Sequence, residues 1–289
     1  SASSINTYLN CPLQFYFSVV EGMAEEDEIA ETIEASTFGT IFHSVMEWLY
    51  KPFVGKMVTA DLLHRISKDE KLLTETIERS FAENYFNTPD RVKSLTGQNF
   101  LTGEVLRKYV KQVLATDAKL TPFIYVESEK RIVVDYPLPS GKNVSLKRFI
   151  DRVAEVKGHT RIIDYKTGKG VLRFRSMKDL FDKELKDRPK AVMQVFMYAL
   201  LYQMELPEKI TEPGIYYLRN LFDNKFDADV IYRPDKSDIR ITDFRDYEKD
   251  FKELFDSCLE EIFDPDTSFG QTPTGEACKW CPFTNICKK

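Results

Sequence analysis

The sequence predicts an α/β fold in which a central mixed β-sheet is flanked by helices. Apolar residues recur at helical spacing through much of the first 120 residues. After Pro122 the pattern changes to successive strands, separated by Pro-Leu-Pro-Ser-Gly and Lys-Gly-His, which predicts an antiparallel meander. Helical spacing then returns before two more strands and a last helix. This order of helices, meander, helix, strands and helix implies a sheet with helices packed on it.

The elements follow in order along the chain. We expect a helix at 5–22 that is interrupted near Cys11-Pro12, and an amphipathic helix at 37–51. Apolar residues at every fourth position predict two long helices, at 59–87 and 100–119. The expected strands are 123–129, 131–136, 144–156, 160–165, 214–220 and 228–233, with helices at 189–204 and 243–263. A turn-rich tail begins at Pro273.

Charge is unevenly distributed along the 289 residues, whose formal net charge is −5. The segment 142–190 holds 15 Lys and Arg against 7 Asp and Glu, a local excess of +8. A basic middle within an acidic remainder fits a localised phosphate-binding surface. Charge alone favours the simpler reading of a solvated, mixed-charge face.

Several classes of protein are not expected. The sequence lacks an apolar run of about 18 residues, so we expect no transmembrane helix. Because the first residues are polar, we expect no secretory leader, and the odd number of five cysteines argues against a disulfide framework. We therefore expect a reducing, cytoplasmic location. Because the chain begins with Ser1 rather than Met, we expect a piece of a longer polypeptide.

The clearest local feature is the run Ile-Ile-Asp-Tyr-Lys-Thr-Gly at 162–168. An apolar strand there carries Asp164 and Lys166 on one face, because side chains alternate along a strand. The preceding strand carries Asp151, and a short turn at 157–159 joins the two strands. Two carboxylates on adjacent strands can hold Mg²⁺, with the lysine beside a phosphate. The alternative is a partly buried ion pair, which a bare D-x-K pattern favours.

The context of this run resembles the RecB-type branch of the PD-(D/E)XK nuclease superfamily. That branch carries Gly-x-x-x-His upstream, and Gly39 to His43 matches it. It carries Gln-x-x-x-Tyr on the next helix, and Gln194 to Tyr198 matches that. With Ile-Asp-Arg-Val at 150–153 and the run at 162–168, these make four motifs that stand in the family's order. The resemblance implies a restriction-endonuclease-like core at about 123–220 in a single nuclease domain, with 54–120 as a helical insertion.

The resemblance also implies roles for individual residues. His43, Asp151 and Asp164 correspond to ligands of Mg²⁺ or Mn²⁺, with the carbonyl of Tyr165 as a further ligand. Lys166 corresponds to the catalytic lysine. Gln194 is expected to position that lysine or the attacking water, and Tyr198 to pack near the site or contact DNA. Glu127, Glu129 and Glu155 are open candidates for assisting the metal, and strand parity favours Glu155 slightly.

One departure from the family pattern is Arg148, which stands where the family usually has glycine. An arginine there narrows the groove or supplies a phosphate contact. The expected activity is a metal-dependent deoxyribonuclease acting as an exonuclease in double-strand-break repair. The sequence carries no G-x₄-G-K-[S/T], so an AddB/RecB-like role requires a helicase-like region or partner subunit elsewhere. The alternatives are a catalytically silent DNA-binding module and a stand-alone CRISPR-adaptation-type nuclease.

The tail at 273–289 carries Cys278, Cys281 and Cys287 as C-x₂-C-x₅-C. Thiolates this close in sequence can share one metal centre, and Cys11 or Cys258 can complete it. Cys258 lies on the apolar face of a helix and is expected in the core. AddB-type nucleases pair one upstream cysteine with three such C-terminal ones, and the resemblance implies Cys11 and a [4Fe–4S] cluster. Four cysteines also suit Zn²⁺.

Overall fold

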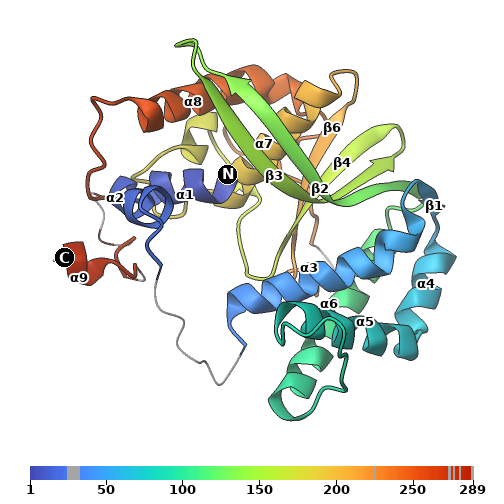
Figure 1. The fold of residues 1–289 in the computed structure, drawn as a ribbon. Helices are drawn as coiled ribbons and strands as arrows, with labels where there is room; N and C mark the ends of the chain where they lie inside the picture. Colours follow the sequence, from blue (N-terminus) through green and yellow to red (C-terminus); the bar gives the residue numbers. More distant parts are fainter. Residues whose placement is uncertain (25–32, 224–225, 273–274, 276, 280, 288–289) are drawn as a thin grey trace.

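A five-stranded mixed sheet forms the centre of the molecule (Figure 1). The computed structural model describes residues 1–24, 33–223, 226–272, 275, 277–279 and 281–287, and Arg148 by its backbone alone. The strand order is β1 (Lys56–Val58), β2 (Phe123–Pro137), β3 (Asn143–Val156), β4 (His159–Lys166) and β6 (Thr211–Tyr217). The first four strands pair antiparallel, whereas β4 and β6 pair parallel. The predicted mixed sheet with an antiparallel meander is confirmed.

Two strand predictions are wrong in detail. The expected pair of strands at 123–129 and 131–136 is the single strand β2, which pairs with β3 on both sides of Glu129. The charged run around Glu129 interrupts the apolar alternation, although the backbone ladder continues. The expected strand at 228–233 is reduced to β7 (Ile231–Tyr232), which joins β5 (Arg173–Phe174) and β8 (Ile239–Arg240) in a small second sheet.

The N-terminal segment is broken where the sequence predicts. Helix α1 (Ala2–Asn10) ends at Cys11, and α2 (Pro12–Phe15) and the π-helical turn η1 (Tyr16–Val20) follow. Cys11 is extended, with φ −160° and ψ 110°, because a residue before proline avoids the helical region. The amide of Leu13 donates to the carbonyl of Gly270 at 3.0 Å, which ties this segment to the C-terminal part of the chain.

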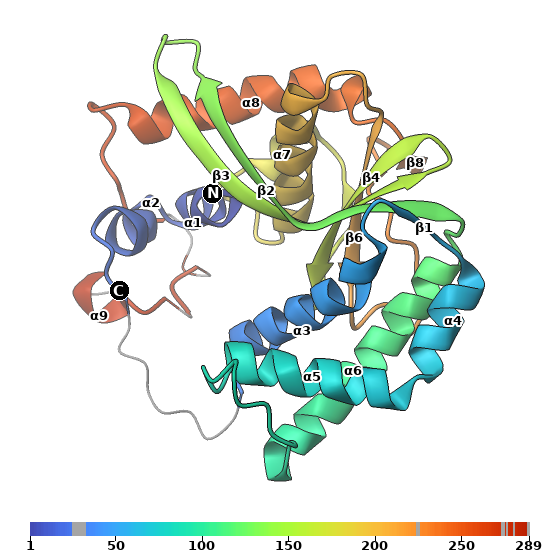
Figure 2. The same ribbon diagram turned by 45° about the vertical axis from the view of Figure 1, so that its right-hand side comes forward.

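A layer of helices covers one face of the sheet (Figure 2). It consists of α3 (Ala35–Tyr50), the short η2 (Lys51–Phe53), α4 (Ala60–Lys68), α5 (Glu70–Asn84) and α6 (Gly97–Ala118). The single helix expected at 59–87 is therefore two. Asp69 separates them: its backbone is not helical, and its side chain accepts from the amide of Leu72 at 3.0 Å to cap α5.

The other face carries α7 (Lys190–Glu205), α8 (Arg245–Phe263), η3 (Met177–Leu180) and α1. Helix α7 makes the crossover that parallel strands β4 and β6 require. Neighbouring residues of β4 face the two layers in turn: Ile162 packs with α7, and Ile163 packs with α3 and α6. The C-terminal α9 (Thr284–Cys287) lies beside α2 (Figure 1). Among the described residues, no helix is long and apolar enough to cross a membrane.

The alternation of β3 breaks at Asp151. Ile150 packs in the core beside α7, whereas the guanidinium of Arg152 lies among the rings of Tyr50, Phe123 and Tyr125 on the opposite side. On the paired strand, Glu129 has a positive φ of 46°. Irregular positions of this kind re-aim side chains in a sheet. Asp151 and Glu129 therefore both depart from the regular alternation of side chains, at facing positions of β3 and β2.

Arg152 is fully buried and pairs with Asp117, which is also fully buried on α6. The Nη1–Oδ2 distance is 2.5 Å. The hydroxyl of Tyr216 donates to the other carboxylate oxygen at 2.8 Å, and that of Tyr50 donates to Oδ2. Nε and Nη2 of Arg152 have no hydrogen-bond partner among the described residues. This pair joins α3, α6, β3 and β6 behind Asp151.

Candidate metal and catalytic site

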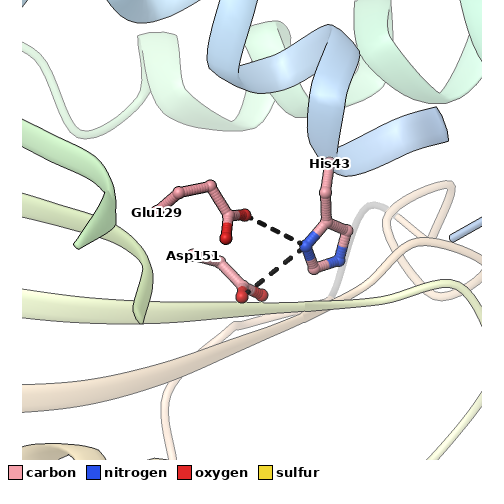
Figure 3. Close-up of side chains that lie close together, drawn as sticks. All are labelled: His43, Glu129 and Asp151. Carbon is pink, nitrogen blue, oxygen red and sulfur yellow. Dashed lines mark ion pairs between the residues drawn. The ribbon is translucent and has the colours of Figure 1, made fainter. Parts of the chain in front are cut away.

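Three possible metal-ligand residues, one histidine and two acids, meet at the break in the sheet. Nδ1 of His43, on α3, lies 3.5 Å from Oε1 of Glu129 and 3.6 Å from Oδ1 of Asp151. Figure 3 shows the imidazole pointing toward both carboxylates. One ligand atom from each residue lies within 4.8 Å of the other two, which makes this the group among the described residues that is suited to a metal ion. Nε2 of His43 lies 3.2 Å from the carbonyl oxygen of Tyr165.

The second part of the site lies at the end of β4. Asp164 is fully buried, and Nζ of Lys166 lies 2.8 Å from its Oδ2 and 3.0 Å from its Oδ1. Gln194 on α7 donates to Oδ1 of Asp164 at 2.9 Å and also contacts the hydroxyl of Tyr198. Tyr198 is buried. The chain of contacts from Tyr198 through Gln194 to Asp164 fixes one carboxylate oxygen.

The carboxylates of the site are held close together in a buried environment. The amide of Tyr165 donates to Oδ2 of Asp151 at 2.7 Å, which leaves Oδ1 on the side of His43. Burial raises the pKa of Asp151, although His43 opposes the shift. Burial also raises the pKa of Asp164, with Lys166 opposing it. Oδ2 of Asp164 is buried with an ion pair to Lys166 but with no hydrogen bond of suitable geometry among the described residues.

The pKa of His43 is raised as well, but by charge rather than by burial. Burial by itself lowers its pKa, but the negative charge of Asp151, followed by Glu129 and Asp164, raises the pKa to about 9. The neighbouring carboxylates therefore stabilise the protonated, positively charged form of the imidazole. In chemical terms, the site is a pocket of negative charge that a cation neutralises.

A cavity of about 780 Å³ opens beside His43 on the α3 and α5 side. Its charged walls are mainly acidic and include Glu47, Glu83 and Glu129. Trp48 also lines it, donating from Nε1 to Glu83 at 2.9 Å. Lys166 lies at the boundary of this cavity, with a side chain about one third exposed. The lysine ammonium is therefore within reach of a molecule that enters from solvent.

The structure brings Glu129 to the metal-ligand group, and not Glu127 or Glu155. Glu155 shares strand parity with Asp151 but lies four residues, or roughly 13 Å, along the strand, and it pairs with Lys209. Glu127 is near Lys130 at 3.5 Å. Strand parity was misleading because it gives the face of a side chain and not its distance along the strand, and because the alternation of β3 breaks at Asp151. The sequence signal that could have found Glu129 is the interruption of the apolar pattern there.

Four cysteines lie around one small cavity between the two ends of the chain. Its lining includes Cys11, Cys278, Cys281, Cys287, Gln14 and Thr272. Among the described residues, no three of these sulfurs lie within 4.8 Å of one another. A single tetrahedral zinc needs sulfurs about 3.8 Å apart, from Zn–S bonds of about 2.3 Å. Cys258 is separate, buried in the core on α8, and burial raises its pKa to about 12.

Gly170 lies just after the site, and an alanine there meets the ring of Tyr217. A Cβ built on Gly170 lies 2.0 Å from Cζ of Tyr217, whereas one on Gly168 meets no atom within 4 Å. We expect Gly170→Ala to lower stability by about 1–3 kcal/mol, since an overpacked site must shift. Urea unfolding measures the change, with Gly168→Ala as the matched control. Equal stability of the two variants would show that the loop adapts freely.

Arg148, the departure from the motif pattern, contributes its backbone to β3 opposite Ile132. Its side chain lies outside the described residues, so the expected narrowing of the groove or phosphate contact stays a prediction. Within the cysteine tail, residues 273–274, 276, 280 and 288–289 also lie outside them.

Comparison with known proteins relates the chain to a family and to a bacterial protein. The family model described as PD-(D/E)XK nuclease superfamily matches residues 1–288. An uncharacterised protein of Rickettsia felis is 23% identical over 170 residues, which are 58% of this chain and 18% of that protein. The chain therefore matches less than a fifth of the length of that relative.

Proposed function

Because the chain belongs to the PD-(D/E)XK nuclease superfamily, we propose that it hydrolyses phosphodiester bonds of DNA with Mg²⁺ or Mn²⁺ held at His43, Glu129 and Asp151. The observation that carries the proposal is the convergence of these three residues beside Asp164 and Lys166. We infer further that it acts as an exonuclease, as the resemblance to the RecB-type branch implies.

The residues fit a divalent cation. Carboxylate oxygens suit Mg²⁺ and Mn²⁺, and imidazole is acceptable to Mn²⁺. Nδ1 of His43 faces the carboxylates, so its Nε2–H can donate to the carbonyl of Tyr165, as ligating histidines commonly do. The partly unsatisfied Oδ2 of Asp164 supplies a further ligand atom. Direct ligation by the carbonyl of Tyr165 stays a prediction.

A bound divalent cation polarises the phosphate and lowers the pKa of a bound water. The protein residues supply the rest. The ammonium of Lys166, held by Asp164 at 2.8 Å, is placed to neutralise charge that develops on the phosphate. Gln194 holds Asp164 through a hydrogen bond of 2.9 Å, and the hydroxyl of Tyr198 contacts the amide of Gln194. Gln194 thereby positions the lysine indirectly.

Metal binding is expected to release protons at pH 8. His43, whose pKa is about 9, is protonated there in the metal-free protein and must lose that proton to become a ligand. The metal affinity should therefore fall as pH decreases below 9, by up to about tenfold per pH unit for one released proton. Titration calorimetry of Mn²⁺ in two buffers with different ionisation enthalpies counts the protons.

The matched control for this titration is His64→Gln, since His64 is exposed on α4 away from the site. That variant should release as many protons as the parent, and His43→Gln should release fewer. Equal proton release by His43→Gln would place the proton on another group.

The direct test of function is cleavage of end-labelled single- and double-stranded DNA by protein purified without oxygen. We expect cleavage with Mg²⁺ or Mn²⁺ and none with EDTA. The pattern of labelled products distinguishes nibbling from an end from internal cuts. Absence of cleavage by folded, metal-loaded protein would favour the catalytically silent DNA-binding module instead.

We also propose that Cys11, Cys278, Cys281 and Cys287 hold a [4Fe–4S] cluster. One observation supports it: the four residues line one cavity. In such a cluster each cysteine binds a different iron. Such a centre would connect residue 11 to residue 287, where Phe17 already contacts Phe283.

Iron and sulfide analysis of anaerobically purified protein tests this centre. About four irons and four sulfides per chain are expected, and Cys281→Ala should lose them. Cys258→Ala is the control and should keep them, because Cys258 is buried on α8 away from the tail. One zinc per chain and no iron would overturn the proposal.

The order of the four motifs supports a place within an AddB/RecB-like helicase–nuclease that acts in double-strand-break repair. The match to a small fraction of a much longer relative agrees with a role inside a larger polypeptide. Copurification of the full-length protein with a helicase subunit tests this assignment.

A further inference from the structure

A basic groove leads away from Lys166 on the α7 side of the site. A cavity of about 380 Å³ lies between residues 166–171 and 186–191. Its charged lining residues are Lys166, Lys169, Lys186, Arg188, Lys190 and the single acid Asp187. A second cavity, of about 440 Å³, shares four residues of the segment 186–190 and adds Lys183 and Lys279 together with Glu184. We call these two cavities, which share these lining residues, the basic groove.

Arg188 forms the floor of the basic groove. Its side chain is buried, and its guanidinium donates to side-chain oxygens of Asn6 at 2.7 Å and Asn10 at 2.9 Å. It also donates to the carbonyl of Leu180 at 3.2 Å. All of these acceptors are neutral. The negative charge of Asp182 also attracts the guanidinium, but the described residues form no ion pair with it. A buried cation without a paired anion favours an anionic ligand nearby.

The two sides of the catalytic centre differ in charge. The cavity beside His43 has acidic walls, with Glu47, Glu83 and Glu129, whereas the basic groove has cationic ones. Lys166 lines both and marks the boundary between them. A polyanion is therefore attracted on the α7 side and repelled on the α3 side.

We propose that the basic groove holds the phosphate backbone of one nucleic-acid strand, which reaches the catalytic centre from the α7 side alone. The inference rests on the proposed nuclease function and adds the direction and the residues of substrate binding. Cations that follow one another along a groove can be contacted by one flexible backbone, and basic grooves of this kind bind single strands.

The test removes two exposed groove lysines, Lys169 and Lys190. Binding of a fluorescent 20-nucleotide thymidine strand is measured by anisotropy in EDTA, so that the strand is not cleaved during the measurement. Two phosphate contacts fewer should lower the salt slope of binding by about 1.4 and weaken binding by about 25-fold at 0.1 M salt. Lys169→Gln/Lys190→Gln is the variant, and thermal unfolding confirms that it is folded.

Two controls sharpen the result. Lys108→Gln removes an exposed lysine of α6 that lines neither cavity of the groove, and it should bind like the parent. Lys169→Arg/Lys190→Arg keeps the charges and should retain most of the binding. Equal affinity and equal salt slope for the glutamine variant and the parent would overturn the proposal. The proposal would also be overturned if the glutamine substitutions weakened binding of a blunt 20-base-pair duplex as much as they weaken binding of the single strand.

The same experiment separates failure of this inference from failure of the proposed function. Binding in EDTA requires no catalysis, so a protein that cleaves nothing can still show the groove. Conversely, hydrolysis of bis(p-nitrophenyl) phosphate reports on the catalytic centre with a substrate too small to fill the groove. If the ratio of oligonucleotide to small-diester hydrolysis is the same in the glutamine variant and the parent, the groove does not carry the strand.

Discussion

Replacing Asp164 with asparagine is expected to lower metal-dependent DNA cleavage by about 10³-fold, the size of effect found when one preorganised charge is lost from an active site. The change keeps the shape of a fully buried side chain, so the fold should persist. It removes the anion that Nζ of Lys166 contacts at 2.8 Å and the partly unsatisfied oxygen that we assign to the metal. Single-turnover cleavage of end-labelled DNA in Mg²⁺ measures the loss.

The matched control is Asp135→Asn. Asp135 is an exposed carboxylate on β2, the strand that also carries Glu129, and its loss leaves the site contacts intact. We expect parental activity for this variant. Cleavage by Asp164→Asn at the parental rate would mean that the reaction takes place elsewhere on the protein or comes from a contaminant.

Replacing Asp117 with alanine is expected to destabilise the fold by about 3–5 kcal/mol, because Arg152 is then left as an uncompensated buried charge. The hydroxyls of Tyr50 and Tyr216 lose their acceptor as well. For a chain of this size the melting temperature should fall by roughly 10 °C. Urea unfolding followed by circular dichroism measures the free energy of unfolding.

Two further variants show whether burial of the charge is the cause. Glu75→Gln breaks an exposed pair in which the Lys71 and Glu75 side chains are 85% and 62% exposed, so it should cost less than about 1 kcal/mol. The double variant Asp117→Leu/Arg152→Met removes both buried charges and should recover part of the stability lost in Asp117→Ala. If the double variant were less stable than Asp117→Ala, ring packing around Arg152 would matter more than charge.

Local patterns predicted most of the secondary structure because they reflect local physics. Proline after Cys11 breaks the first helix, and the turns at 138–142 and 157–158 separate strands that pair antiparallel. Errors occurred where tertiary contacts override the local pattern. Helix 59–87 divides at Asp69, whose side chain caps the next helix, and β2 runs through the charged residues near Glu129.

The candidate site shows the same division. Spacing alone placed Asp164 and Lys166 on one face of a strand. The order of the motifs linked them to His43 and Gln194. The structure brings these residues together. Their catalytic and metal-binding roles remain predictions. Glu129 could not be selected from Glu127 and Glu155, because parity gives no distance along the strand and the alternation of β3 breaks at Asp151.

By itself the sequence determined the class of fold, the order of the elements and the residue types that meet at the end of β4, because helical and strand periodicity and short motifs are local properties. Only the tertiary structure decided which glutamate joins His43 and Asp151, and that Asp117 on α6 neutralises Arg152. It also decided that the lysines at 166–190 line a groove on one side of the site. These contacts join residues far apart in the chain, and their geometry depends on how sheet and helices pack.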